Sequence, residues 1–389
     1  WQGRRFLKDR LDWNLLRTYL AIGQERSISR AAARLYVTQS AVSQSLKRLE
    51  EQLDCPLILR RGPRFDLTQA GEEVLAIEPI LHQQQVEALR VISRDAQGEQ
   101  HVRTTRSVVV SAGGTPRIPE AFKALKGDSR VFHHSQYLER MASQPCVDGK
   151  PMRIAVIGGG QSAAEAFIDL NDSFPSVQVD MILRGSALKP ADDSPFVNEV
   201  FSPAFTDLVF QQVGAERERL VAEYQNTNYS VVDLDLIERI YGIFYRQKVS
   251  GIARQAFRTL TVVEKATPGP LGIELALRNS ATGETSLNHY DAVILATGYE
   301  RQMHRELLAP LEAYMGDFEV ARDYRIVTDE RCKAGIYIQG FSQASHGLSD
   351  TLLSVLPIRA DEIAASLYAL DHHRGKARSV QDLLLATAS

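Results

Sequence analysis

The sequence has few cysteines and no long hydrophobic run. Its 389 residues include three cysteines, at positions 55, 146 and 332, without the paired spacing of a disulfide framework or a zinc site. The longest apolar runs have the length of a strand, far below the ~20 residues that a membrane helix needs. The chain starts with a basic stretch, which is not typical of a signal peptide. We therefore expect a cytoplasmic protein without a metal site.

The chain as a whole has no large net charge, but its two parts carry opposite net charges. The 45 Lys and Arg and the 48 Asp and Glu give a net charge of -3. Residues 1–66 contain 13 Lys and Arg against 7 Asp and Glu, a net charge of +6, which leaves -9 for residues 67–389. This asymmetry predicts a basic module that binds a polyanion, joined to a body with another partner. Ordinary variation in surface charge is the alternative.

Residues 11–53 predict three short helices, because apolar residues recur there at helical spacing in three groups. Thr38 is a candidate N-cap of the third helix, which we expect to run from Gln39 to about Gln52. A helix of this kind, after a tight turn, suits the major groove of DNA. Its polar side carries amide, hydroxyl and basic groups that can reach phosphates and base edges, namely Gln39, Ser40, Ser43, Gln44, Lys47 and Arg48.

Two short strands are expected at 55–59 and 64–67, around a basic turn whose Arg61 and Arg64 can lie along a DNA backbone. A long helix is expected from Thr68 to about Arg90. Three motifs, SRAAARL at 29–35, VTQSAVSQ at 37–44 and LTQAG at 67–71, resemble the winged helix-turn-helix and linker helix of LysR-type transcriptional regulators. The resemblance implies double-stranded DNA as a partner. A three-helix domain with an exposed polar face is the alternative.

A strand and a glycine-rich turn predict a dinucleotide site. The buried-type strand 153–157 runs into Gly158-Gly159-Gly160-Gln161-Ser162-Ala163, followed by a helix. In this Gly-x-Gly-x-x-Ala pattern, Gly158 permits the tight turn and Gly160 lets the backbone approach a pyrophosphate at the helix N-terminus. The next strand ends at Arg184, where NAD-specific folds carry an acidic residue. A guanidinium pairs with a 2′-phosphate, so we expect NADPH. A glycine-rich turn with a solvated arginine is the alternative.

Four motifs in order, at 158–165, 193–201, 226–233 and 296–299, resemble the flavin-dependent N-hydroxylating monooxygenases. Within that family they are most similar to the branch that hydroxylates the side-chain amine of L-ornithine for pyoverdine-type siderophores. The resemblance runs from about residue 107 to near the end of the chain. It implies that NADPH reduces FAD and that the reduced flavin activates oxygen for transfer to the amine.

The resemblance also implies cofactor contacts for individual residues. Two positions in the first helical turn meet the NADPH phosphates, and the arginine after the second strand meets the 2′-phosphate. The turn that follows the strand at 335–340 faces the flavin, through backbone amides at a helix start. In this sequence the nicotinamide cofactor would be held by Gln161, Ser162 and Arg184, and the flavin by Leu348, Ser349 and Asp350.

For the substrate, the resemblance assigns the carboxylate and the α-amine of L-ornithine to Asn198 and Asn228. Neutral amides suit a zwitterion because they leave no unpaired buried charge. Taken alone, asparagines at such positions are more often loop caps. His346 is interpreted as a turn residue, and no residue is assigned a catalytic role. We also expect a homo-oligomer.

The family's N-terminal segment, a strand running into Gly-x-Gly-Pro that binds the FAD pyrophosphate, is not found. Residues 111–116 follow a strand, but Pro116 and Pro119 prevent a helix from starting at the glycines. We expect the regulator module to replace about the first third of the enzyme, FAD to bind weakly and turnover to be impaired. The alternatives are a DNA-binding regulator with a nicotinamide-binding remnant and a gene fusion without function.

The expected fold class is multi-domain: an all-α winged helix-turn-helix module, a Rossmann-like α/β NADPH domain and an incomplete α/β flavin domain. The expected ranges are 1–66 for the DNA-binding module, 67–94 for the linker helix, 95–105 for a linker, 106–147 for a flavin-domain remnant, 148–286 for the NADPH- and substrate-binding domain, and 287–389 for the return to the flavin domain.

Overall fold

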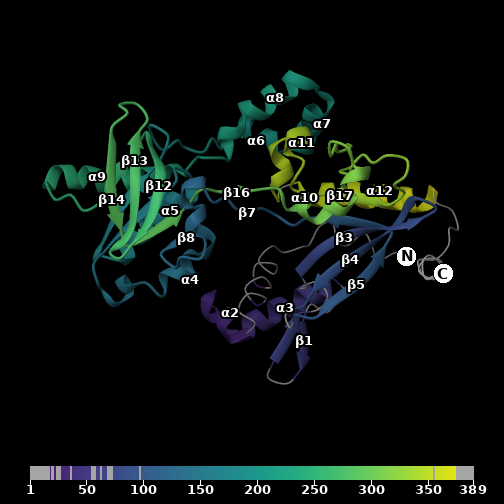
Figure 1. The fold of residues 1–389 in the computed structure, drawn as a ribbon, viewed down its shortest axis with the longest axis horizontal. Helices are drawn as coiled ribbons and strands as arrows, with labels where there is room; N and C mark the ends of the chain where they lie inside the picture. The colour runs from purple at the N-terminus through teal and green to yellow at the C-terminus, as the bar shows by residue number, and fades with distance from the viewer. Residues whose placement is uncertain are drawn as a thin grey trace. The chain divides into compact units, whose positions relative to one another are not determined.

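The computed structural model describes residues 18, 22, 28–35, 37–53, 58–61, 64–67, 73–95, 98–353 and 355–373. For residues 29, 33, 34, 51–53, 58–61 and 64–67 it describes the course of the backbone only. The chain forms two compact units (Figure 1). Unit 1 comprises Trp1–Ser111, His304–Gln339 and Leu356–Ser389, and unit 2 comprises Ala112–Met303 and Gly340–Val355.

Unit 2 is built on a five-stranded sheet in which every neighbouring pair is parallel. Its strands read as short runs of apolar residues, as expected where both faces of a sheet are covered. The predicted strand at 153–157 and the helix after it are confirmed. In spatial order the strands are β11 (Ala256–Arg258), β10 (Val177–Ile182), β9 (Met152–Ile157), β15 (Ala292–Leu295) and β8 (Val131–His133).

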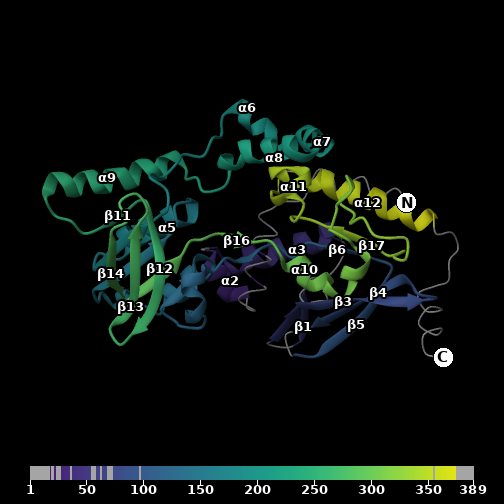
Figure 2. The ribbon, with the colours of Figure 1, turned by 45° about the horizontal axis from the view of Figure 1, so that its top comes forward.

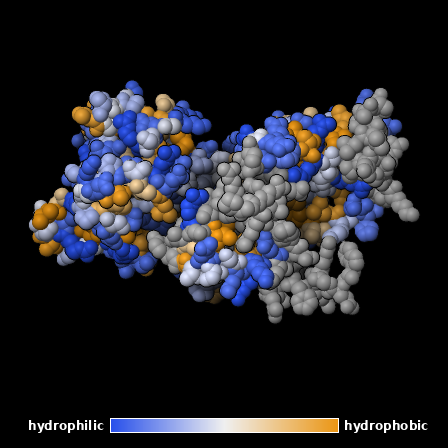
Figure 3. All heavy atoms as spheres, turned by 90° about the horizontal axis from the view of Figure 1, so that it is seen from below, coloured by the Kyte–Doolittle hydropathy of each residue, from blue (hydrophilic) through white to orange (hydrophobic). Residues whose placement is uncertain are grey.

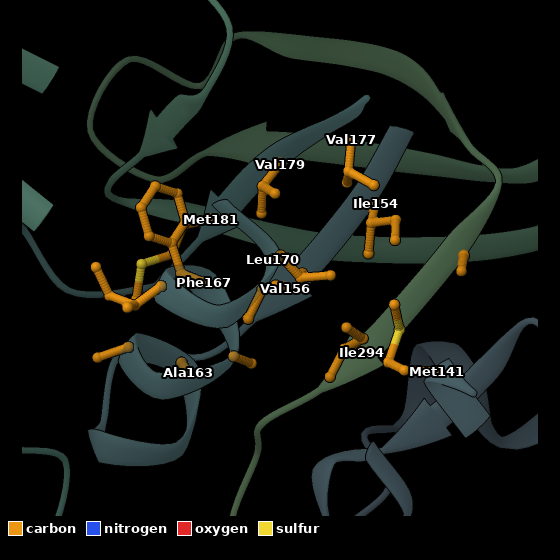
Figure 4. Close-up of a cluster of buried hydrophobic side chains, with 14 of the residues drawn as sticks. Met141, Ile154, Val156, Ala163, Phe167, Leu170, Val177, Val179, Met181 and Ile294 are labelled. Carbon is orange, nitrogen blue, oxygen red and sulfur yellow. The ribbon is translucent and has the colours of Figure 1, made fainter. Parts of the chain in front are cut away.

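Two helices, α5 (Gln161–Ser173) and α9 (Leu234–Ser250), pack against one face of this sheet. Figure 4 shows the side chains between the helices and the sheet, where Phe167 and Leu170 of α5 meet Ile154 and Val179 of the strands. The Phe167 ring also stacks on the ring of Phe244, with centroids 5.6 Å apart. The expected α/β class is therefore confirmed for this unit.

A three-stranded antiparallel meander covers the opposite face of the sheet. Alternate residues of the parallel strands, such as Ala155 and Val293, turn toward it and pack on Ile273 and Leu275. The sheet therefore has α-helices on one side and β-structure on the other. The meander consists of β12 (Thr261–Gly269), β13 (Gly272–Asn279) and β14 (Thr285–Tyr290).

A buried carboxylate joins the sheet to the meander. Asp180 of β10 accepts hydrogen bonds from Arg153 of β9 at 2.8 Å, Arg258 of β11 at 2.9 Å and the Tyr290 hydroxyl of β14 at 2.7 Å. Burial and the neighbouring carboxylate raise the pKa of the Tyr290 phenol, so that it stays a donor. A buried charge is tolerated when it is paired and hydrogen-bonded in this way.

The rest of unit 2 consists of short elements that connect the strands or carry loops. One of them, β7 after the glycines at 113 and 114, is a strand, which confirms that no helix starts at those glycines. These elements are β7 (Thr115–Pro116), η3 (Glu120–Leu125), η4 (His134–Gln136), α4 (Tyr137–Met141), η5 (Pro145–Asp148), α6 (Pro195–Asn198), η6 (Glu199–Phe201), α7 (Pro203–Gln211), α8 (Gly214–Glu223), η7 (Gln225–Thr227), β16 (Tyr299–Glu300), α11 (Gln343–His346) and η9 (Leu348–Thr351).

Unit 1 contains an antiparallel sheet, β3-β4-β5, and a parallel pair, β6 with β17. No described helix in either unit is both long and apolar enough to cross a membrane. The elements of unit 1 are α2 (Ile28–Arg34), α3 (Gln39–Leu53), β1 (Ile58–Arg61), β2 (Arg64–Leu67), β3 (Glu73–His82), β4 (Gln85–Arg94), β5 (Gln100–Thr105), β6 (Ser107–Val110), α10 (Met303–Leu308), η8 (Ala309–Tyr314), β17 (Gly335–Ile338) and α12 (Leu356–His373).

The predicted linker helix over 67–94 is wrong, because β3 and β4 form a hairpin over most of this range. Pro79 lies in the middle of the predicted helix, where it would remove a hydrogen bond and clash with the preceding turn. Gln83 and Gln84 make the hairpin turn, with φ of 49° and 64°. The segment 95–105, expected to be an unstructured linker, ends in β5.

The two units also divide the chain differently from the expected domain ranges. Within 106–147, β6 belongs to unit 1 while β8 is the edge strand of the unit 2 sheet. Residues 340–355 pack in unit 2 and not with the other C-terminal segments. Of the three helices expected over 11–53, the third is α3 and the second is α2, and the first lies largely outside the described residues.

Substitution Phe167→Ala should remove a large, fully buried side chain from the α5 side of the sheet. We expect the free energy of unfolding to fall by about 3–5 kcal/mol, because the surrounding residues close the cavity only in part. Urea denaturation followed by far-UV circular dichroism measures this loss. The matched control is Phe196→Ala, since the Phe196 side chain is 93% exposed. A similar loss for both variants would contradict the assigned core.

Candidate functional site

The glycine turn after β9 lies at the carboxyl end of the parallel sheet, between β9 and β15. Gly158 has a φ of 151°, and a Cβ atom at this position would overlap the carbonyl oxygen of Ala296, directly after β15. Only glycine fits there. Strands β10 and β11 lie on one side of β9, and β15 and β8 lie on the other. In open sheets of this kind, ligands bind at the carboxyl edge where the strand order reverses.

Helix α5 begins at this edge, and no side chain caps its start. Its N-cap residue, Gly160, has an extended backbone with φ of -110° and ψ of -174°. No side chain of the N-cap residue accepts from the first turn, so the N–H groups there can bind an anion. A Cβ at Gly160 would lie 3.6 Å from the Cα of Ser230, an ordinary contact. Ser162, second in the helix, is half-buried.

The side chain of Gln161 is held by the segment that precedes α9. Its Nε2 donates to the Asp233 carboxylate at 2.8 Å and to Glu165 at 3.1 Å. Its Oε1 accepts from the backbone N–H of Asp233 at 2.9 Å. These reciprocal hydrogen bonds fix residues 230–233 against the glycine turn.

Arg184 stands two residues beyond the end of β10, and its side chain is exposed. It forms no ion pair with any residue in the described part of the chain. The backbone beside it is fixed, because Gly185 accepts a hydrogen bond from Leu260 at 2.9 Å. A cation in this position, next to the carboxyl edge of the sheet, is available to an anionic ligand.

Residues 226–233 join the glycine turn to the turn at 340–351. The Tyr229 hydroxyl lies 2.6 Å from the Thr351 hydroxyl and donates to Gln343 at 3.3 Å. Asn228, the neighbour of Tyr229, is exposed after η7. The structure therefore brings a residue predicted for the substrate next to the turn predicted for the flavin.

Asn198, the second residue predicted for the substrate, is exposed at the end of α6. Its Nδ2 donates to the backbone carbonyl of Asp193 at 2.9 Å. No hydrogen bond joins the side chains of Asn198 and Asn228, both of which lie in the described part of unit 2. The two asparagines are thus placed on separate loops and not in one preformed cluster.

The side chains of the turn predicted for the flavin are used inside the protein. Leu348, Ser349 and Asp350 are each buried. Asp350 accepts from the N–H of Ser342 at 2.6 Å, and the Ser349 hydroxyl lies 2.9 Å from that of Thr206. Buried polar side chains satisfied in this way stabilise the turn. What the turn can offer to a ligand is its backbone.

A pair of histidines at the carboxyl end of β8 was not predicted from the sequence. His133 is buried, its Nε2 donates to the Gly298 carbonyl at 2.9 Å, and its Nδ1 accepts from the N–H of Ser135 at 3.3 Å. Burial, with the neighbouring His134, lowers the pKa of His133 to about 4. The ring of Tyr299 lies 5.1 Å from that of His133. A neutral His133 thus anchors the loop after β15. Two adjacent histidines at the end of a short apolar strand were the sequence signal that could have predicted this contact.

The residues predicted to meet DNA lie on and near α3. Thr38 accepts from the N–H of Ala41 at 3.2 Å, which confirms it as a cap of that helix. Ser43 is half-buried, while the other predicted side chains on the helix are exposed: Gln39, Ser40, Gln44, Lys47 and Arg48. Arg61 and Arg64 face each other across the β1–β2 pair, and their side chains lie outside the described part.

Two family models match overlapping parts of the chain. Residues 13–72 match the model of the bacterial regulatory helix-turn-helix proteins of the lysR family. Residues 64–301, well over half of the chain, match the model described as L-lysine 6-monooxygenase/L-ornithine 5-monooxygenase.

One curated relative is the L-ornithine N(5)-monooxygenase of Pseudomonas aeruginosa, 72% identical over 317 residues that cover 82% of this chain and 72% of the relative. The structure of the reduced ornithine hydroxylase of that organism superposes with a TM-score of 0.76 at 66% identity, covering 85% of this chain and 75% of the other. The Kutzneria sp. 744 ornithine N-hydroxylase, solved with reduced FAD, NADP+ and L-ornithine, gives a TM-score of 0.73 at 29% identity, covering 87% and 76%.

These matches agree with the enzyme class and with the cofactor pair, FAD and NADPH, that the sequence motifs predicted. The match to the monooxygenase model begins at residue 64 and includes the glycine turn, both asparagine loops and the loop after β15. The chain therefore belongs to the family of flavin-dependent N-hydroxylating monooxygenases that contains L-lysine 6-monooxygenase and L-ornithine 5-monooxygenase.

Proposed function

We propose that this chain is an NADPH- and FAD-dependent monooxygenase that hydroxylates N5 of L-ornithine for siderophore biosynthesis. The observation that carries the proposal is the 72% identity to an L-ornithine N(5)-monooxygenase across 82% of the chain. The segment 226–233 supports it, because this segment connects the glycine turn, Asn228 and the turn at 340–351 within one unit.

The carboxyl edge of the parallel sheet fits NADPH. The pyrophosphate is held by the uncapped N–H groups of α5, where Gly160 and Ser162 leave the backbone accessible. To reach the phosphates, Gln161 must give up its hydrogen bonds to Asp233 and form new ones to the cofactor. Arg184, which has no ion-pair partner in the described part of the chain, binds the 2′-phosphate. The domain that performs this binding spans residues 148–286.

The substrate contacts follow from the chemistry of an amino acid. Asn228 and Asn198 can each offer an amide N–H₂ to a carboxylate and a carbonyl oxygen to an ammonium group. Asn198 must exchange its hydrogen bond to Asp193 for the ligand. Because two loops hold the carboxylate and the α-amine of the amino acid, these contacts also orient its side-chain amine.

FAD, when bound, supplies the activation of molecular oxygen that no side chain can supply. In the described residues the contacts expected for FAD are confined to the turn at 348–350, whose side chains are already engaged. Among the described residues, the glycines after β6 lead into the strand β7 of unit 2 and not into a helix. We also infer that this chain binds FAD weakly and turns over slowly.

Purified protein tests both statements. We expect less than one FAD per chain by flavin absorbance, and ornithine-dependent NADPH oxidation with a hydroxylated product only when FAD is added in excess. Stoichiometric FAD in the purified protein would overturn weak binding. No hydroxylated ornithine at saturating FAD would overturn the proposed activity.

Asn228→Ala should raise the KM for L-ornithine about tenfold or more, as expected for loss of a hydrogen bond to a charged group, whereas the control Asn226→Ala should not.

Arg184→Glu should change the choice of nicotinamide cofactor. The carboxylate repels a 2′-phosphate, so we expect the Kd for NADPH to rise about 10- to 100-fold while that for NADH stays within about threefold. Titration of protein fluorescence with each nucleotide measures both constants. The control is Lys265→Glu, an equal charge reversal on the exposed side of β12. An unchanged preference for NADPH in the Arg184 variant would exclude the assigned role.

A second proposed function is binding of double-stranded DNA by the N-terminal module. It rests on the match of residues 13–72 to regulatory helix-turn-helix proteins and on the exposed polar side of α3. Phosphate contacts release counterions, so binding should weaken steeply with salt. Such proteins commonly act as dimers, and we propose that this chain is a homo-oligomer.

Fluorescence anisotropy with a 30-base-pair duplex of random sequence checks the DNA proposal. The double variant Lys47→Ala and Arg48→Ala should weaken binding and reduce the slope of log K against log salt by about one per lost phosphate contact. A control, Lys126→Ala in unit 2, should behave like the unchanged protein. Absence of binding at low salt would rule out the proposal.

A further inference from the structure

Helix α9 carries a stripe of large apolar side chains on its outer face. Leu234, Tyr241, Tyr245 and Val249 recur at intervals of seven, four and four residues, and Ile252 follows three residues later, just past the end of the helix. Residues at these intervals lie on one side of a helix. Their exposed fractions range from 58% to 72%.

The opposite face of α9 is the one that packs on unit 2. Ile240 and Ile243 are buried there, and Phe244 contacts the same cluster. Figure 2 shows α9 along the outside of the unit, with α5 and the strands to one side of it. The stripe is thus not part of the core of the described structure.

Exposed apolar side chains are usually scattered, as they are on the face of the molecule drawn in Figure 3. On α9, Tyr241, Tyr245, Val249 and Ile252 follow one another at spacings of three or four residues, and contiguous apolar surface of this kind marks an interaction site.

The charges beside the stripe are arranged by sign. The first half of α9 carries Asp235 and Glu238, and the last half carries Arg246 and Lys248. None of the four forms an ion pair with a residue in the described part of the chain. Arg239 is excluded from this set because it pairs with Asp172 at 2.8 Å.

Two pairs of stripe residues are symmetric about position 243. In a second copy of α9 running antiparallel, Leu234 meets Ile252 and Tyr241 meets Tyr245, apolar against apolar. The acidic half of each helix then faces the basic half of the other. A parallel copy would instead bring like charges together. The sequence of the helix is therefore complementary to itself in one orientation.

Gly242 lies next to the midpoint of the stripe. Glycine inside a helix lowers its stability relative to alanine, and close approach of another backbone is one reason for its presence. A Cβ at this position would meet within unit 2 the Arg246 side chain at 3.5 Å, which is an ordinary contact. The packing of the unit therefore does not explain this glycine.

A groove at the C-terminal end of α9 extends the apolar surface. It has a volume of about 590 Å³, and Tyr245, Val249 and Ile252 line it. In the antiparallel arrangement this end of the helix receives Leu234 of the second copy. The groove gives that exposed leucine a place to be buried.

From these features we propose that α9 pairs with α9 of a second copy of this chain, antiparallel about a two-fold axis near Ile243. The same surface is used by both copies, as in most homodimers. The apolar stripe forms the centre of the contact, and the charged residues form its rim and select the antiparallel orientation.

Sedimentation equilibrium of the full chain tests the proposal. We expect a dimer, or an even-numbered larger assembly, and a fall to half that mass for Tyr245→Glu. The matched control, Leu271→Glu, alters an exposed apolar residue in the β12–β13 turn and should leave the mass unchanged. Circular dichroism verifies that both variants are folded.

Charge reversal separates this arrangement from a general apolar contact. Glu238→Lys and Arg246→Glu should each raise the dissociation constant about tenfold or more, because each places like charges across the two-fold axis. Mixing the two variants should restore association, since the mixed pair again has opposite charges on both sides.

A chain that stays monomeric at about 50 µM, a concentration at which a specific dimer is populated, would overturn the proposal. So would a mass that Tyr245→Glu leaves unchanged, or a mixture of the charge variants that does not associate. Binding of the monomeric chain to vesicles of neutral phospholipid would assign the stripe to a membrane and would equally overturn pairing of two copies.

Discussion

The contact between Gly158 and Ala296 is the constraint on which the site in unit 2 depends. The glycine turn and the loop after β15 are so close that a single Cβ atom would separate them. This closeness keeps β9 and β15 in parallel register and starts α5 at the carboxyl edge of the sheet. His133 fixes the same loop from the other side through the Gly298 carbonyl. The edge is thus rigid before any ligand binds, as precise binding geometry requires.

The three regions of unit 2 that we propose to bind ligands are connected by one short stretch of chain. Asp233 holds the side chain of Gln161, and Tyr229 holds Thr351, with Asn228 directly before the second of these anchor points. A family that combines a nicotinamide cofactor, a flavin and an amino acid needs all three near one another. The polar contacts of residues 228–233 meet this need within the unit.

The sequence predicted the elements that depend on local pattern. The strand at 153–157, the glycine turn and the cap at Thr38 follow from residues that are adjacent in the chain, so periodicity and motif were sufficient. The hairpin at 73–94 stands where a linker helix was expected after the winged module, and Pro79, whose effect on a helix is local and severe, is the residue that argues against that helix. Contacts across the chain, such as Asp180 with Tyr290 or Tyr229 with Thr351, join residues more than a hundred positions apart and leave no local trace.

The reciprocal hydrogen bonds between Gln161 and Asp233 have a thermodynamic consequence. A ligand at the start of α5 that takes Gln161 away from Asp233 changes the free energy of the segment that carries Asn228. If a ligand at the start of α5 changes the affinity at Asn228 by some factor, linkage requires that a ligand at Asn228 change the affinity at α5 by the same factor. With the proposed binding roles, one glutamine side chain would make the affinities of two separate molecules depend on each other.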